Sequence, residues 1–344
     1  MSTPKSRDLT RRRKRRAELF APPKELAAGR PIPLSLIELH LSFGKHQSRD
    51  DAAELAVEMQ KHDPHVFVQE TVDMPEAERA AVIARINHEN ERARRERAFR
   101  DALLAPTSRH GAAWEHEYSR EERRLVIDSK HSFFYLVEGY SPGELAEWRQ
   151  AMAASLDQRP LEARLVCGDI DGALHLEREK LGRFARVAIA AKNKRIVEGF
   201  ERMRGELLHA VPKLAGRTPL KVLARYGRSH EQICPLLRER GFRITHAGTE
   251  APAVFSDVAL NRLSAGESVS DEIIAAALFQ DLHSTVFPEA VARRYAEWSR
   301  VLHRSFDRVG RVPGFLALLR ESAARTGELG ALAAHIGQAL RSLT

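Results

Sequence analysis

The sequence is poor in cysteine, in aromatic residues and in long apolar runs. Its two cysteines, Cys167 and Cys234, form neither a disulfide framework nor a metal-finger spacing. Their apolar surroundings predict that both are buried and reduced, as suits a cytoplasmic protein. No apolar run is long enough to span a membrane, and the residues that follow the basic N-terminal segment are too polar for a signal-peptide core. We therefore expect a globular, cytoplasmic protein.

Common catalytic and nucleotide-binding motifs are also missing. The chain contains no GxGxxG loop, no Walker loop, no GxSxG nucleophile elbow and no HExxH zinc motif. Nucleotide-binding, serine-hydrolase and zincin functions therefore have no support in the sequence.

Positive charge is concentrated in an N-terminal arm. The formal net charge is +8, of which residues 1–16 carry +7, so that the rest of the chain is close to neutral. We expect residues 1–30, which are basic and polar, to form a disordered arm. Three interpretations remain open for it: a solvated tail, a weak contact with a nucleic acid or another anionic surface, and a targeting signal.

Residues 34–70 predict a strand–helix–strand unit. An apolar run at 34–41 is followed by a helix at 49–62, whose apolar residues recur at three- and four-residue steps, and by a second apolar run at 65–70. A unit of this kind makes its two strands parallel. Glu38 and His40 share one face of the first strand, because side chains on a strand alternate between its faces.

A second segment repeats this arrangement. An apolar strand at 220–226 is followed by a turn at Gly227, by His230 near the start of the next helix, and by a further strand. His40, Glu70 and His230 are thus all predicted at carboxyl ends of parallel strands, where open α/β sheets bind their ligands. We expect the three side chains to converge there.

The whole pattern is typical of an α/β fold. We expect an α/β domain over residues 31–250, with a central, mostly parallel sheet flanked by helices, and a helical C-terminal region over residues 251–344. Between the two α/β segments the sequence predicts a helix at 74–104, a loop at 105–122, a hairpin or bent strand at 124–141 and a helix at 142–156. A strand-like run at 161–172, which includes Asp169 and Asp171, is followed at 174–211 by one long helix or by two helices broken near Gly182.

Imidazoles and carboxylates that meet at a sheet edge suit a divalent ion such as Mn, Fe, Co or Zn. Such an ion lowers the pKa of bound water, and a free glutamate can move the proton. Glu138, Asp169 and Asp171 also lie near predicted strand ends and could join the site. For each of these residues the alternative is an ordinary role as a helix cap, an ion-pair partner or a surface residue.

Several stretches resemble the TraB/Tiki family of the erythromycin esterase/ChaN-like superfamily. Residues 227–230 (GRSH), with the helix and Gly241 after them, are similar to that family's second Gly-x-x-His element. Residues 37–40 and 66–70 are similar to its first histidine strand and to its strand ending in Glu, and residues 191–200 to its Arg-Asn helix.

The resemblance implies a metal-dependent hydrolase of peptide, ester or amide bonds, acting on a small-molecule or peptide substrate. It implies metal ligation by His40, Glu70 and His230, catalysis by Glu70 and, through the wider superfamily, by Glu38, and substrate binding by Lys192 and Asn193. The sequence departs from the family where Ile37 replaces the first Gly and Lys192 replaces the usual Arg.

Two other functions stay open at this stage. One is a non-catalytic binding or regulatory protein on the same fold, with a degenerate site and the C-terminal helices as its interaction surface. The other is a nucleic-acid-associated protein that works through the basic arm.

Overall fold

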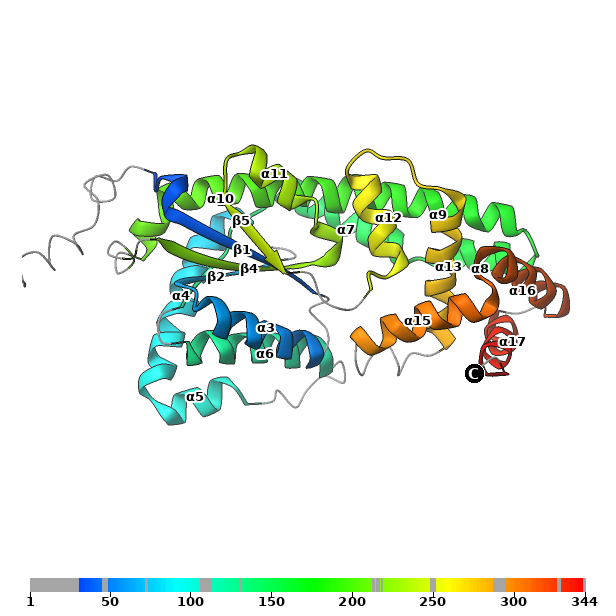
Figure 1. Ribbon diagram of the computed structural model, residues 1–344, viewed down its shortest axis with the longest axis horizontal. Coiled ribbons are helices and arrows are strands. Elements are labelled where there is room, and N and C mark those ends of the chain that lie inside the picture. Colours follow the sequence, from blue (N-terminus) through cyan, green and yellow to red (C-terminus); the bar gives the residue numbers. More distant parts are fainter. Residues whose placement is uncertain are drawn as a thin grey trace, which may run out of the picture.

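A five-stranded, all-parallel sheet forms the centre of the α/β fold (Figure 1). The computed structural model describes residues 31–344 except for 45–48, 72–73, 106–112, 130–131, 212–213, 215–216, 218, 248–251, 287–294, 327–328 and 343–344. The strand order is β3-β2-β4-β1-β5. In chain order the strands are β1 (Ile37–Gly44), β2 (Val66–Gln69), β3 (Phe133–Tyr135), β4 (Leu220–Gly227) and β5 (Ile244–Ala247).

Helices cover both faces of this sheet, as the near-continuous burial of its strands requires. In Figure 1, α3 (Arg49–His62) and α6 (Ala113–Asp128) lie below the sheet, and α10 (Ala191–Ala210) and α11 (Ile233–Glu239) lie above it. Two further helices, α4 (Glu76–Arg95) and α5 (Arg97–Leu103), connect β2 to α6.

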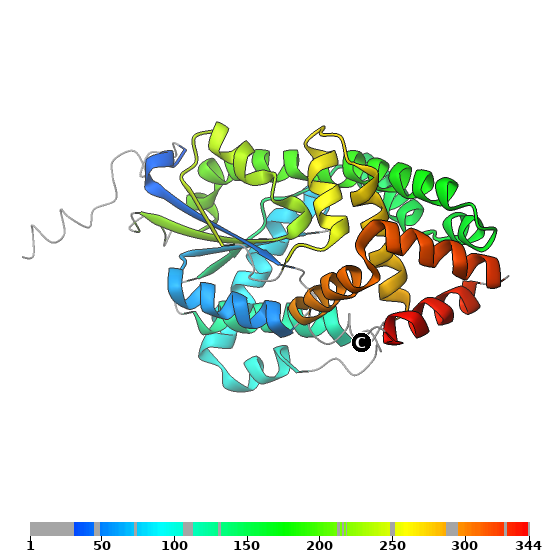
Figure 2. The same ribbon diagram turned by 45° about the vertical axis from the view of Figure 1, so that its right-hand side comes forward.

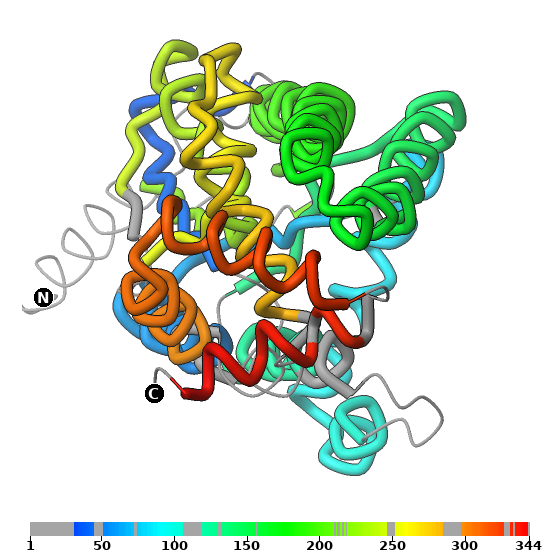
Figure 3. Tube along the Cα trace, turned by 90° about the vertical axis from the view of Figure 1, so that its right-hand side faces the viewer, coloured from blue at the N-terminus to red at the C-terminus, as the bar shows by residue number. Residues whose placement is uncertain are grey.

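A second, wholly helical layer adjoins the sheet. It contains α7 (Pro142–Leu156), α8 (Arg159–Val166), α9 (Ile170–Phe184), α12 (Phe255–Ser264), α13 (Asp271–Val286), α15 (Tyr295–Val309), α16 (Arg311–Arg325) and α17 (Leu329–Ser342). Figures 2 and 3 show the C-terminal helices beside α8 and α9. One apolar core unites them, with Leu165 of α8 and Phe279, Phe315 and Ile336 from three later helices. Helices from both sides of residue 250 therefore pack as one body.

One long helical run links the two layers. Helix α9 continues through a π-helical stretch (Ala185–Ala190) into α10, which carries Phe200 and Met203 into the core of the sheet. The π-helical stretch packs against α12 of the helical layer. Lys192 and Asn193 lie in the first turn of α10, directly after this stretch, so the same run also positions two of the predicted site residues.

The mostly parallel sheet with flanking helices, the helix at 49–62 and the helix at 142–156 are confirmed. The helix at 142–156 begins as its sequence indicates, with Ser141 accepting from the Glu144 N–H and Glu144 accepting from the Ser141 N–H. In the part of the chain that the structure describes, no helix is long and apolar enough to cross a membrane. The basic arm at 1–30 lies outside the described residues.

Several local predictions are wrong. The run at 161–172 is not a strand, because Leu161 and Leu165 lie one helical turn apart on α8 and enter the helical core. The expected loop and first strand around 105–128 instead contain α6, whose buried side includes the charged residue Glu122 and so breaks an apolar period. Cys167, at the end of α8, is exposed, whereas Cys234 is buried as expected.

Candidate functional site

Glu70 is the centre of a buried polar cluster at the carboxyl edge of the sheet. It follows β2 directly, beside the end of β4, with which β2 is paired. Its Oε2 accepts a hydrogen bond from the backbone N–H of Gly227 at 2.6 Å, and its Oε1 lies 2.5 Å from Lys192 Nζ. Both carboxylate oxygens thus have a strong donor, which holds the ionised form in place.

His230 approaches Glu70 from the end of β4. A single turn of 3-10 helix, Arg228–His230, places its imidazole at the carboxyl edge of the sheet. Nδ1 lies 2.6 Å from Asn193 Oδ1, and Nε2 lies 3.4 Å from Glu70 Oε1. With the amide oxygen of Asn193 as acceptor, Nδ1 carries the proton and Nε2 faces Glu70.

Glu138 completes the cluster from the segment after β3. Its Oε1 lies 3.7 Å from Lys192 Nζ, and its Oε2 accepts from the backbone N–H and the hydroxyl of Thr71. Burial, with Glu70 nearby, raises the pKa of Glu138 to about 7. Burial opposes the charge on Lys192, but Glu138 and Glu70 outweigh it and raise the pKa of this lysine. The cluster therefore holds a fixed cation and a carboxyl that exchanges its proton near neutral pH.

Two buried tyrosines stand close to these carboxylates. Burial and the charges of Glu138 and Glu70 raise the pKa of Tyr140 and of Tyr226. Neither hydroxyl has a hydrogen-bond partner among the residues that the structure describes. Buried hydroxyls normally bond to protein or to ordered water, so this side of the cluster offers two donors to a water molecule or a ligand.

Four of the predicted site residues meet here: Glu70, Lys192, Asn193 and His230. Glu138, named from the sequence as a possible addition, joins them. Asp169 does not, because it caps α9 through the N–H of Gly172.

His40 does not reach this cluster, and neither does Glu38. In the sheet register His40 pairs with Leu223, whereas Gly44 pairs with Gly227. His40 is thus four residues upstream of the edge, or about 13 Å along the strand. The predicted convergence of His40 with Glu70 and His230 is therefore wrong. It assumed that β1 ends near residue 41, but the strand continues to Gly44.

The same register shows that Gly44, not Ile37, is the β1 counterpart of Gly227. Ile37 pairs with Leu220 at the opposite end of the strand. A side chain at Gly44 would collide with the guanidinium of Arg225 and with the carboxylate of Asp51. That close approach is the structural reason for glycine at this position.

The edge cluster does not fit the divalent ion that the family resemblance implies. An ion bridging Glu70 and His230 would need Glu70 Oε1, but Lys192 Nζ already lies 2.5 Å from that oxygen. The other oxygen is held by the Gly227 N–H. The third predicted ligand, His40, is on another part of the sheet.

His40 instead belongs to a second cluster, on the α3 face. Its Nε2 lies 2.6 Å from Glu58 Oε2, and His62 Nε2 lies 3.1 Å from the same oxygen. The two imidazoles are stacked, with ring centroids 3.6 Å apart. His40, Glu58 and His62 form a group of ligand atoms that can hold a metal ion. Burial, followed by the nearby His62, lowers the pKa of His40 to about 4.

Sequence reasoning missed Glu58 and His62, although a signal was present. They are four residues apart in α3 and so lie on one side of the helix. The prediction for α3 used only the spacing of its apolar residues and did not consider the spacing of its polar ones. A pocket of about 610 Å³ adjoins this cluster and is lined by residues that include Glu38, His40 and His62.

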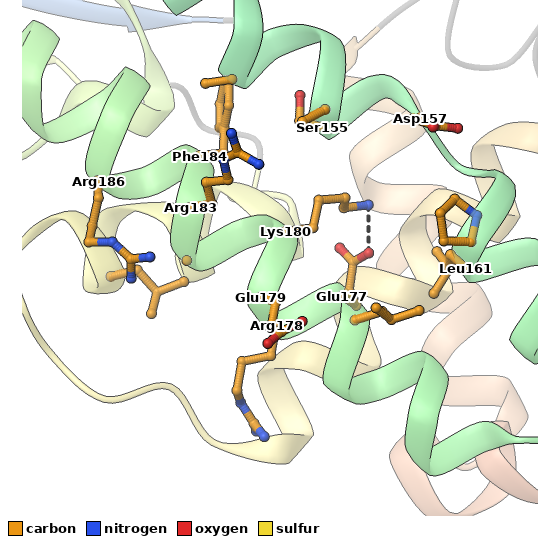
Figure 4. Close-up of a pocket in the computed structure, with 16 residues that line it drawn as sticks. Ser155, Asp157, Leu161, Glu177, Arg178, Glu179, Lys180, Arg183, Phe184 and Arg186 are labelled. Carbon is orange, nitrogen blue, oxygen red and sulfur yellow. Dashed lines mark ion pairs between the residues drawn. The ribbon is translucent and has the colours of Figure 1, made fainter. Parts of the chain in front are cut away.

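Another pocket, of about 620 Å³, lies in the helical layer between α7, α8, α9 and α12 (Figure 4). Lys180 lies 2.5 Å from Glu177 Oε2 and 2.9 Å from Asp281 Oδ2. Burial and Asp281 raise the pKa of Glu177 to about 7. Lys180 is thus already matched by two carboxylates, and the pocket shows no comparable set of converging catalytic groups among the described residues.

Comparisons of the chain with protein-family models, with curated proteins and with solved structures found no match.

Proposed function

We propose that the protein is a hydrolase of peptide, ester or amide bonds and that its reaction takes place at the carboxyl edge of the sheet. The observation that carries this proposal is the continuous buried chain of contacts from Asn193 through His230 and Glu70 to Lys192. The family resemblance implies the same activity on a small-molecule or peptide substrate.

The chain of contacts assigns a role to each side chain. Asn193 fixes the tautomer of His230, so that Nε2 can take a proton from an attacking water molecule. Glu70, 3.4 Å away, stabilises the imidazolium that forms. Lys192 balances the charge of Glu70, and the hydroxyls of Tyr140 and Tyr226, which have no hydrogen-bond partner among the described residues, donate to the oxyanion of a tetrahedral intermediate. The imidazolium then returns its proton to the leaving group.

A metal ion has no step in this proposed reaction, because Lys192 supplies the positive charge at Glu70. The Mn, Fe, Co or Zn ion that the resemblance implies would find a matching donor set at His40, Glu58 and His62 instead. The hydrolysis proposed here should therefore be insensitive to chelators.

Burial favours a second candidate, a non-catalytic binding or regulatory protein. The side chains of Glu70, Lys192 and His230 are only 13%, 6% and 4% exposed. In that case the contacts would serve stability alone, and the helical layer would supply the interaction surface.

A substrate panel with two variants separates these candidates. We would assay nitrophenyl esters, aminoacyl anilides and a mixed peptide library, with EDTA present. We expect turnover by the parent, a loss of about 100-fold or more in His230→Gln, and parental activity in His175→Asn, which changes an exposed histidine on α9. If the parent turns over no substrate faster than His230→Gln, the hydrolase proposal is rejected and the binding protein is favoured.

A further inference from the structure

We propose that His40, Glu58 and His62 form a binding site for a divalent transition-metal ion such as Zn²⁺ or Fe²⁺, and that this ion takes a small anion as a further ligand from the adjoining pocket. The site is separate from the sheet-edge cluster and does not depend on the proposed hydrolysis.

Three ligand atoms converge at this site. The Nε2 atoms of His40 and His62 lie 2.6 and 3.1 Å from one oxygen of Glu58, and all three candidate ligand atoms lie within 4.8 Å of one another. Apart from these mutual contacts, none of the three atoms has a hydrogen-bond partner among the residues described. Two imidazoles and one carboxylate are a donor set that suits Zn²⁺ and Fe²⁺.

Rigid elements of the fold hold these ligands. Glu58 and His62 project from one side of α3, one helical turn apart. His40 is in the interior of β1, between β4 and β5. Its other ring nitrogen, Nδ1, lies 2.9 Å from the hydroxyl of Thr245 on β5. A histidine that ligates through one nitrogen and donates from the other to a fixed oxygen has the orientation typical of metal ligands.

A further ligand can reach the site from a pocket. His40 and His62 line a pocket of about 610 Å³, and the side chain of His62 is 25% exposed. Two of the three ligands thus face the pocket, and a site with three protein ligands leaves a coordination position for an exchangeable group, unlike a closed structural site.

Charge in the pocket indicates the nature of that group. Lys61, Lys221 and Arg243 line the pocket, together with the acidic residue Glu38. With the ion added, positive charge predominates, which favours a carboxylate or phosphate over a neutral or cationic molecule. The inference is thus a metal centre that binds a small anion.

Metal binding is tested on the full chain after removal of bound ions with a chelator. We would titrate Zn²⁺ by calorimetry and follow Co²⁺ by its visible absorption. We expect one ion per chain, with affinity reduced at least tenfold in His62→Asn and in Glu58→Gln. These positions are partly exposed, so the variants should fold, which circular dichroism verifies.

The matched control is His175→Asn. His175 and Glu179 form an i,i+4 pair on α9 that resembles the Glu58–His62 spacing, but both side chains are more than half exposed and, among the residues that the structure describes, no strand histidine joins them. This variant should bind like the parent. The metal site is overturned if the parent binds none of Zn²⁺, Co²⁺, Fe²⁺ and Mn²⁺, or if folded His62→Asn and Glu58→Gln bind as tightly as His175→Asn.

Acetate and inorganic phosphate test the anion. Either should change the absorption of the Co²⁺-loaded parent, with an affinity about fivefold lower in Lys221→Gln, which loses one charge at the pocket. A response to acetate alone would identify a carboxylate as the ligand, and a response to phosphate alone a phosphate. No response to either would overturn the anion part of the inference.

Discussion

Both clusters on this sheet pair a glutamate with histidine, but they differ in how the negative charge of the glutamate is matched. At the edge, Glu70 faces His230, and Lys192 supplies a positive charge 2.5 Å from its Oε1. On the α3 face, Glu58 meets two imidazoles, and no lysine or arginine forms an ion pair with it among the described residues. Lys192 therefore balances the charge of Glu70 in the edge cluster, whereas the cluster on the α3 face has the donor set of a metal site.

Arg225 forms the boundary between the two clusters. Arg225 lies between the two clusters in register, bonded to Ser42 Oγ at 2.5 Å and to Asp51 Oδ1 at 3.1 Å. It is 1% exposed. A buried guanidinium held on both sides keeps the clusters apart, so substitutions in one should leave the other unchanged.

The largest effect is expected from Lys192→Met. The substitution leaves Glu70 and Glu138 buried without their cation and should lower the free energy of unfolding by about 3–5 kcal/mol, as measured by urea denaturation. Lys194→Met is the control on the same helix. Lys194 is 79% exposed, and its ion pair with Glu198 Oε1 is long, at 4.0 Å. A similar loss in both variants would contradict the central role of Lys192.

Glu138→Gln tests the proton at the edge. Burial raises the pKa of Glu138 from 4.5 to about 7, so between these values the folded protein keeps a proton that the unfolded chain has released. The stability that this proton provides is complete below the unfolded pKa and is lost as the pH rises towards 7. We expect the parent to lose more unfolding free energy than Glu138→Gln between about pH 5 and about pH 7.5. Parallel curves would mean that Glu138 is ionised throughout.

Gly44→Ala tests the boundary. The added methyl group would displace Arg225 and Asp51 and should cost about 1–3 kcal/mol of unfolding free energy. Gly205→Ala is the matched change, since an added Cβ on α10 would meet no atom within 4 Å and should stabilise the helix by roughly 0.5–1 kcal/mol. Thermal unfolding should therefore show a lower melting temperature for Gly44→Ala and a higher one for Gly205→Ala. A gain at Gly44 would show that the Arg225 contacts adjust freely.

The smallest effect is expected from Thr245→Val. It removes the hydroxyl that orients His40 and should weaken Zn²⁺ binding about tenfold, without changing turnover at the edge. Calorimetry and the ester assay measure the two responses. If turnover fell together with metal affinity, the two clusters would act as one site, and the contrast between them would be lost.

Much of the sheet could be predicted because parallel strands have a local signature. The apolar runs near residues 37 and 220 and the apolar stripe of α3 are set by periods of two and 3.6 residues, which are visible in a short window. Glu70 and His230 of the edge cluster could be named from the sequence for a related reason: both follow strands, and strand ends meet at one edge. Lys192 and Asn193 were named only through the family resemblance.

Two of the errors share a cause, which is that the residues that determine burial and register are distant in sequence. The run at 161–172 has the composition of a strand, but Leu161 and Leu165 pack into a core built largely after residue 250. Likewise, nothing near residue 40 indicates that β1 continues to Gly44, because its register depends on pairing with β4 and β5.

The sequence by itself determined the α/β class, the helix at Arg49–His62, and the position of Glu70 and His230 at strand ends, because these depend on local periodicity and chain direction. Which residues belong to which cluster depends on the tertiary structure. In the register of β1, His40 lies four residues from the edge. The packing of α10 brings Lys192 Nζ within hydrogen-bond distance of Glu70 Oε1. Both outcomes depend on contacts between segments more than 100 residues apart, which no local pattern records.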